Sequence, residues 1–228
     1  MNKLFGLFLL ALAFLAPGSA DAANRFAVCA TTCTWDNSST AMWSTTTGGA
    51  TGASAPTTAD VAILDAATCV GGTTCTITTF AGTITVNELN MDACTASTSG
   101  CILEASTNNT NFTITGTNGF HSTGAGTRTL NMGSGTWTLS SANTQWNVVS
   151  SLTLNAGTST ISTTSSNGVI FTGGTKTYAT LSIGAISASA GIFTFNNSNT
   201  FATLTIAAPN RIQANNGLTQ TITTITAI

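Results

Sequence analysis

The sequence predicts an all-β protein, a right-handed parallel β-helix (β-solenoid) with an N-terminal cap. Three observations predict it: apolar and polar residues alternate past residue 60, a heptapeptide recurs at a fixed offset, and charge is nearly absent. Alternation with period two places apolar side chains on one face of a sheet and polar ones on the other. An antiparallel β-sandwich, which also consists of short alternating strands, is the alternative fold.

Residues 1–22 are expected to be a secretory signal peptide. Lys3 precedes an apolar run at residues 4–15, and residues 20–22 (Ala-Asp-Ala) form a small-x-small cleavage site. A membrane anchor is the alternative, but the run has 12 residues, and about 20 are needed to span a bilayer. The mature chain is therefore expected to be secreted or held at the cell surface, without membrane insertion after cleavage.

All six cysteines follow the cleavage site, which agrees with export to an oxidising compartment. Six cysteines allow about 15 pairings, and their spacing favours three local disulfides over free thiols. A zinc site would need closely spaced Cys or His ligands, and no such spacing occurs. The expected pairs are Cys29 with Cys33, Cys69 with Cys75, and Cys94 with Cys101.

The heptapeptide TYATLSI at Thr177–Ile183 recurs as TFATLTI at residues 200–206, an offset of 23 residues. A period in the low twenties is typical of one turn of a parallel β-solenoid. The segments from Trp146 to residues 152–154 and from Val86 to residues 89–91 are interpreted as weaker copies of the motif. About seven such turns fit between residue 60 and residue 228.

The residues before the repeats are expected to form a separate N-terminal segment. Residues 23–60 are assigned to a cap or linker, and residues 61–228 to the β-helix. Trp35 and Trp43 are expected to plug the end of the core, which a solenoid must cover. Residues 221–228 keep the strand pattern without a charge or a capping segment. We therefore expect the sequence to continue in a longer chain, or another element to cover this end.

The N-terminal pattern also carries a resemblance. Trp35-Asp36, Trp43-Ser44, Pro56 and Ala59-Asp60-Val61 are followed by Thr/Gly/Asn-rich turns and Leu-x-Leu or Leu-x-Ile strands. This pattern resembles exported and cell-surface β-helix proteins of bacteria, adhesin-like or autotransporter-passenger-like, whose fold is shared by pectin-lyase-like enzymes. The resemblance implies a stalk or a binding surface on or outside the cell.

Charge is scarce throughout the chain. Lys and Arg together number five and Asp and Glu seven, so that 5% of residues are charged and the net charge is −2; an average domain has about 25% charged residues. Nucleic-acid binding needs many cations to neutralise phosphates, and this composition excludes it.

No catalytic, cofactor-binding or metal-binding residue is predicted, and no cofactor. A glycosidase needs two carboxylates beside the scissile bond, but all acids of the mature chain lie before residue 105. Asp60 with Asp65, or Glu88 with Asp92, would be the alternative acid pair or calcium site, although calcium takes six to eight oxygens. The cations Arg25, Arg128, Lys176 and Arg211 are widely separated.

Four aromatic or titratable side chains in the middle of the chain are candidates for a functional role. His121 is expected to be a solvated loop residue without a catalytic partner, and Phe120 beside it to be free for exposure. Trp137 and Trp146 stand in alternating strands, so core packing is favoured over sugar binding.

These observations favour a non-catalytic structural or adhesive module that binds surfaces or glycans through a Thr/Asn-rich face. Ice binding through ranks of Thr-x-Thr is the second hypothesis, although irregular spacing gives no reason to place all ranks on one face. A polysaccharide-active enzyme is the third, and homo-oligomerisation is left open. The Thr-x-Thr pairs are Thr76/Thr78, Thr83/Thr85, Thr113/Thr115, Thr136/Thr138, Thr203/Thr205 and Thr221/Thr223.

Overall fold

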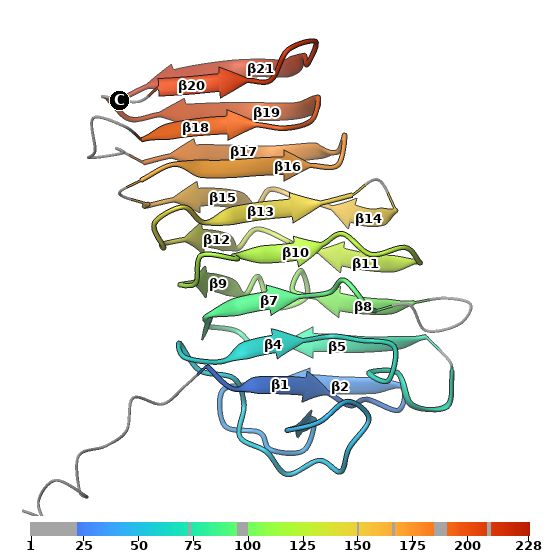
Figure 1. Ribbon diagram of the computed structural model, residues 1–228. Helices are drawn as coiled ribbons and strands as arrows, with labels where there is room; N and C mark the ends of the chain where they lie inside the picture. The colour runs from blue at the N-terminus through green and yellow to red at the C-terminus, as the bar shows by residue number, and fades with distance from the viewer. Residues whose placement is uncertain are drawn as a thin grey trace, which may run out of the picture.

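The computed structural model describes residues 22–72, 74–94, 100–149, 151–165, 167–184, 191–208 and 211–228. Within these residues the chain forms 21 β-strands and one 3₁₀ turn, Val70–Gly72. The predicted signal peptide lies outside the described residues except for its last position. Successive strands stack in layers from the N-terminal to the C-terminal end (Figure 1).

The strands form three sheets, which we name sheets I, II and III. Sheet I has the order β20 (Arg211–Ala214), β18 (Ile192–Phe195), β16 (Val169–Gly173), β13 (Gln145–Val148), β10 (Phe120–Ser122), β7 (Glu88–Asn90), β4 (Val61–Ile63), β1 (Asn24–Ala27) and β3 (Trp43–Ser44). Sheet II has the order β14 (Leu152–Asn155), β11 (Arg128–Asn131), β8 (Cys101–Glu104), β5 (Cys75–Thr79) and β2 (Thr32–Trp35). Sheet III has the order β21 (Gln220–Ala227), β19 (Asn199–Ile206), β17 (Thr177–Ile183), β15 (Thr160–Thr163), β12 (Thr136–Leu139), β9 (Asn111–Ile114) and β6 (Thr83–Val86).

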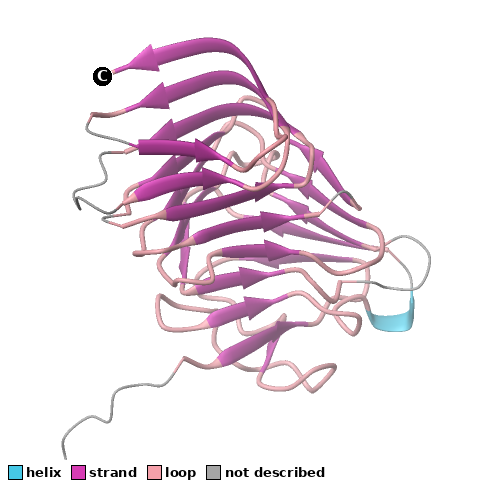
Figure 2. Cartoon of the chain, turned by 45° about the horizontal axis from the view of Figure 1, so that its top comes forward, coloured by secondary structure: helices cyan, strands magenta, loops and turns pink. Residues whose placement is uncertain are grey.

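Parallel pairing between strands from successive turns makes the fold a β-solenoid and excludes the antiparallel sandwich. Among the described strands, only the β1–β3 pair is antiparallel. Apart from β3, the strands of each sheet run in one direction, with loops at the corners (Figure 2). Seven strands of sheet I follow residue 60, and the chain completes six turns between the first and the last of them. This number is close to the seven turns expected from the sequence.

The register confirms the main repeat and corrects its weaker copies. Leu181 of β17 pairs with Leu204 of β19 in sheet III. The proposed copy at residues 152–154, however, lies in sheet II, and Leu89 lies in sheet I. The residue beneath Leu181 is instead Ile161. The assignment failed because one turn holds more than one short apolar strand, and sequence similarity alone does not distinguish the sheets.

Sheet II ends at β14, after which each turn of the solenoid has two strands. A tight turn connects β16 directly to β17, with Gly174 at φ 64° and Thr175 at φ 59°, the left-handed values of a type I′ turn. Tyr178 supports this turn by donating a hydrogen bond to the Gly173 carbonyl at 2.9 Å, and it accepts one from Trp146 Nε1 at 3.0 Å. Burial raises the pKa of the Tyr178 hydroxyl above its ordinary value. The hydrogen bond from Trp146 lowers this pKa by a smaller amount, so the net shift is upward.

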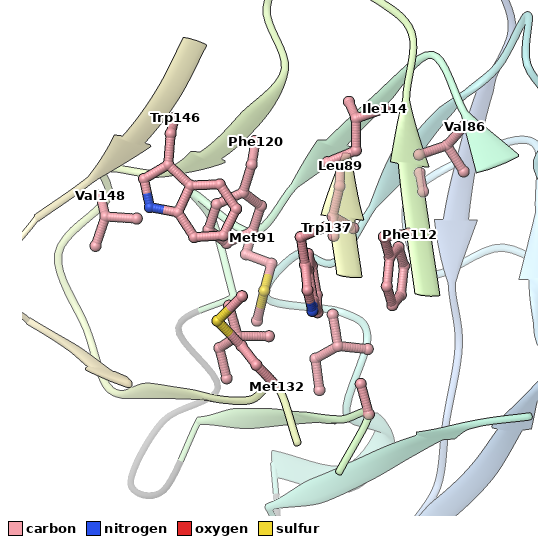
Figure 3. Packing of buried hydrophobic residues seen from close by; sticks show 14 of the residues in the cluster. Val86, Leu89, Met91, Phe112, Ile114, Phe120, Met132, Trp137, Trp146 and Val148 are labelled. Atoms are coloured by element: carbon pink, nitrogen blue, oxygen red, sulfur yellow. The ribbon is translucent and has the colours of Figure 1, made fainter. Parts of the chain in front are cut away.

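Aromatic side chains fill the interior from one turn to the next. Phe112 and Trp137 stack with their ring centroids 4.2 Å apart, and Trp146 lies edge-on to Trp137 at 6.1 Å. Phe120, Met91 and Met132 surround them (Figure 3). Such ring pairs add about 0.5–1.5 kcal/mol beyond the burial of their area. Trp137 and Trp146 are fully buried, which confirms their predicted role in the core.

The N-terminal segment places two tryptophans at one end of this core. Trp35 and Trp43 are both fully buried and meet edge-on at 4.9 Å. Trp35 also contacts Phe112, with 5.7 Å between ring centroids. The same segment supplies β1 and β2, which pair in parallel with β4 and β5. The first strands of sheets I and II thus precede residue 61.

The three predicted disulfides are present, and no cysteine is free: Cys29–Cys33, Cys69–Cys75 and Cys94–Cys101. The second cysteine of each pair lies in a strand of sheet II: Cys33 in β2, Cys75 in β5 and Cys101 in β8. Cys75 also pairs with Cys101 in the parallel register of β5 and β8. Three intact disulfides indicate an oxidising environment.

We expect Leu181→Asp to destabilise the protein by about 3–5 kcal/mol, because it removes a buried side chain and buries an unpaired charge. Leu181 is fully buried, whereas the adjacent Thr180 is partly exposed on the outer face. Urea unfolding monitored by circular dichroism measures the change, with Thr180→Ser as a near-silent control. Equal stability of the two variants would contradict the assignment of these residues to opposite faces.

Candidate functional site

The outer face of sheet III carries two continuous ranks of hydroxyl side chains, which we call the threonine face. The parallel register places one residue from each of seven strands in each rank. The face includes Asn111, but no Asp, Glu, Lys or Arg. Rank one is Thr83, Asn111, Thr136, Thr160, Thr180, Thr203 and Thr224, and rank two is Thr85, Thr113, Thr138, Ser162, Ser182, Thr205 and Thr226.

The ranks form a lattice set by backbone geometry. Neighbouring strands in a sheet lie about 4.7–4.9 Å apart, and residues i and i+2 on one face lie about 6.6 Å apart. Thr83, Asn111, Thr224 and Thr226 are exposed, and the other members of the two ranks are partly exposed. β-Branched Thr suits this position, because it fits a pleated surface and presents both a methyl and a hydroxyl group.

None of the 13 hydroxyls of the threonine face takes part in a hydrogen bond within the described part of the chain. Asn111 is different, because its Oδ1 accepts the Thr136 amide at 2.7 Å. A hydroxyl offers one donor and two acceptor sites. The face therefore presents a regular array of donors and acceptors that is open to solvent or to a ligand.

On the outer faces of the other two sheets, some of the polar side chains bond to one another. On sheet II, Asn155 donates to Asn131 at 2.6 Å, and Asn131 donates to Glu104 at 2.6 Å. Just past the ends of β20 and β18 in sheet I, Asn215 donates to Asn196 at 2.7 Å, and Asn196 in turn donates to Thr172 of β16. These ladders satisfy their groups internally, so they are weaker candidates for ligand contact.

The sequence identified part of the threonine face. Thr83/Thr85, Thr136/Thr138 and Thr203/Thr205 lie in it as whole pairs, and Thr113 without Thr115. Thr76/Thr78 lies in sheet II, and Thr221/Thr223 lies in β21 outside the two ranks. The predicted pairs thus do not all share one face, as their irregular spacing indicated. Within sheet III the spacing is also irregular, with 28 residues from Thr85 to Thr113 and 20 from Ser162 to Ser182, but corner loops absorb the difference.

Sequence reasoning missed three pairs of the face. These are Thr160/Ser162, Thr180/Ser182 and Thr224/Thr226. Two signals in the sequence could have identified these pairs. Ser can replace Thr at the second position, and each pair flanks an inward apolar residue: Ile161, Leu181 or Ile225.

The carboxylates hold turns and loops rather than forming a common site. Among the described residues, no group of three or more His, Cys, Asp or Glu side chains is placed to hold a metal ion. Of the alternative pairs Asp60/Asp65 and Glu88/Asp92, the side chains of Asp60, Asp65 and Glu88 are buried. The acids accept bonds as follows: Asp36 from Ser38 and Ser39, Asp60 from Thr57, Asp65 from Ala67 and Thr68, Glu88 from Asn90 and Asn118, Asp92 from Thr123, and Glu104 from Ser106, Thr107 and Asn131.

His121 and Phe120 correct the sequence interpretation. Both lie in β10 rather than in a loop. Phe120 is fully buried against Trp146, with 4.5 Å between ring centroids. His121 is half-buried on the outer face, and its Nε2 is buried without a hydrogen-bond partner among the described residues. Phe-His-Ser is an alternating tripeptide, but its flanking Gly residues concealed the strand.

Arg128 is fully buried, which sequence spacing did not indicate. Its Nε donates to Ser122 Oγ at 2.6 Å, and its Nη2 donates to the Gly124 carbonyl. Desolvation lowers the pKa of Arg128, while the charge of Asp92 raises it. The guanidinium therefore fastens the loop between β10 and β11 instead of serving a surface site.

Comparison of the chain with protein-family models, curated proteins and solved structures finds no match. Within the described ranges, no helix has the length and apolar character needed to cross a membrane.

We expect Glu104 to stabilise the fold in a pH-dependent manner. Partial burial raises the pKa of Glu104, but hydrogen bonds from Ser106, Asn131 and Thr107 outweigh it and hold the pKa below 4.5. The lowered pKa adds stability above pH 4.5, and this contribution is lost as pH falls through the folded-state pKa. In urea unfolding, wild type should therefore exceed Glu104→Gln in stability at neutral pH, and the difference should shrink in acid. A difference that grows in acid would contradict this prediction.

Proposed function

We propose that this protein is an exported structural or adhesive module that binds uncharged, hydroxyl-rich surfaces, foremost glycans, through the threonine face. The observation that carries the proposal is the array of 13 hydroxyls on one sheet that have no hydrogen-bond partner within the described residues. Disulfides support a location outside the cytosol, and the resemblance to adhesin-like surface proteins supports an origin in bacteria.

The mechanism is multipoint contact by neutral groups. A hydroxyl that exchanges water for a ligand hydroxyl gains about 0.5–1.5 kcal/mol, so a single contact is weak and a rank of them is strong. The Thr methyl groups add apolar contact against the carbon face of a sugar ring. Because the face carries no charge, its binding should be nearly insensitive to salt.

A second candidate function is ice binding, and the two-rank lattice specifically favours it. Two regular spacings, about 4.8 Å between strands and about 6.6 Å along them, fit a crystalline surface better than a single flexible ligand. Both functions use the same residues but differ in the surface bound. A polysaccharide-active enzyme finds less support, since the threonine face has no carboxylate.

We expect the triple variant Thr113→Val, Thr138→Val, Thr205→Val to bind at least about tenfold more weakly than wild type, from three lost hydroxyl contacts. Val retains the β-branched shape, so the fold should persist. Binding is measured by co-sedimentation with cellulose, chitin and mannan at low and high salt, beside thermal hysteresis in ice.

Thr153→Val is the matched control, because Thr153 is exposed on the outer face of sheet II and its hydroxyl has no partner in the described chain. Retention on a polysaccharide supports the adhesive proposal, and hysteresis without retention supports ice binding. Equal weakening of the triple variant and Thr153→Val, or strong salt dependence, would overturn the role of the threonine face.

A further inference from the structure

We propose that a cleft beside the cap end of the threonine face binds the terminal unit of an uncharged glycan chain. This inference rests on the proposed function and deepens it, because it adds a site for a chain end to a face that contacts the length of a chain. The cleft has a volume of about 240 Å³ and is lined by Asn37, Pro56, Thr57, Thr58 and Thr85.

The cleft is continuous with the threonine face. Thr85 of β6 lines it and is also the first member of rank two. The other four lining residues come from the segments that follow β2 and precede β4. The cap thus forms a wall at one end of rank two, and a chain lying along that rank would meet this wall with its end.

Hydrogen bonds hold both sides of the cleft in place before any ligand binds. On one side, Thr57 donates from its amide at 2.9 Å and from its hydroxyl at 2.7 Å to Asp60. The Thr58 carbonyl accepts a bond from Thr115 Oγ1 at 3.2 Å. On the other side, Asn37 Nδ2 donates to the Thr83 carbonyl at 3.0 Å. A preorganised site loses less entropy on binding than a mobile one.

Three polar groups of the cleft are left for a ligand. Within the described chain, neither the Thr58 hydroxyl nor the Thr85 hydroxyl takes part in a hydrogen bond, and the Asn37 Oδ1 accepts none. Pro56 is largely buried and forms part of the apolar lining of the cleft. Hydroxyls and an amide oxygen around an apolar wall are the combination that binds the hydroxyls and carbon face of a sugar.

A second cleft provides a contrast that strengthens this choice. It has about 290 Å³ and lies where sheet II ends, lined in part by Thr172, Thr175 and Asn197. Here the polar groups are engaged: Thr172 accepts from Asn196, Thr175 donates to the Gly174 carbonyl, and Asn197 Oδ1 accepts the Gly174 amide at 3.3 Å. The larger cleft therefore has fewer groups to offer.

Size and charge define the ligand class. Pockets for drug-sized molecules begin at about 300 Å³, so the cleft at the cap suits one small unit rather than several. No Asp, Glu, Lys or Arg lines it, which disfavours charged sugars. A neutral terminal monosaccharide within a longer chain meets both conditions.

The test is titration of the purified protein with neutral oligosaccharides, followed by amide chemical shifts in NMR. Linear cello-, chito-, manno- and malto-oligosaccharides provide chain ends, and a cyclodextrin provides the malto linkage without an end. We expect at least one linear series to shift Thr58 and Thr85, the cyclodextrin to leave both unchanged, and Thr58→Val to weaken binding about five- to tenfold. Thr153→Val serves as the matched control.

The two proposals fail separately. The rank-two variant (Thr113→Val, Thr138→Val, Thr205→Val) should lose retention on polymer while keeping oligosaccharide shifts in the cleft, and Thr58→Val should do the reverse. Retention on polymer with no linear oligosaccharide in the cleft, or cyclodextrin binding as tight as the linear form, overturns the chain-end site and leaves the proposed function standing. Cleft binding without polymer retention overturns the role of the face and supports the cleft.

Discussion

Parallel, in-register stacking of successive turns is the constraint on which the rest of this structure depends. Each inward side chain lies against its equivalent in the neighbouring turn, as Trp137 does against Phe112 and Ile161. A single turn has no core of its own, so its apolar residues are buried only by its neighbours. Burial of each large apolar side chain contributes about 1.5–3 kcal/mol, and this contribution fixes the register because a slip by one residue would turn the apolar set outward.

The same constraint aligns the outer residues, although no contact between them is needed. Since inward Leu181 must lie beside Leu204, the outward Thr180 is placed beside Thr203 and Ser182 beside Thr205. Corner loops differ in length without disturbing this alignment, because they lie outside the paired segments. The threonine face is therefore a consequence of core packing, and its chemistry depends only on which residues occupy the outward positions.

Features encoded within a few residues could be predicted from the sequence, and features set by pairing between turns could not. The three disulfides are local pairs, and Leu181 and Leu204 belong to one long repeated motif. By contrast, the burial of Arg128 and the end of sheet II depend on how far each corner loop extends. Residues 152–154 resemble the repeat in sequence but belong to another sheet, because similarity of a strand does not specify its position around the turn.

The contrast between the three outer faces explains why one of them is suited to a ligand. The asparagines on sheet II and at the strand ends of sheet I donate hydrogen bonds to neighbouring side chains. A ligand would have to break bonds such as the one from Asn155 to Asn131. The hydroxyls of the threonine face lose only bound water when a ligand arrives, and a neutral hydroxyl costs far less to desolvate than a charge. Under the proposed function, such a neutral lattice discriminates by shape and spacing rather than by charge, which favours ordered, hydroxyl-bearing surfaces and chains.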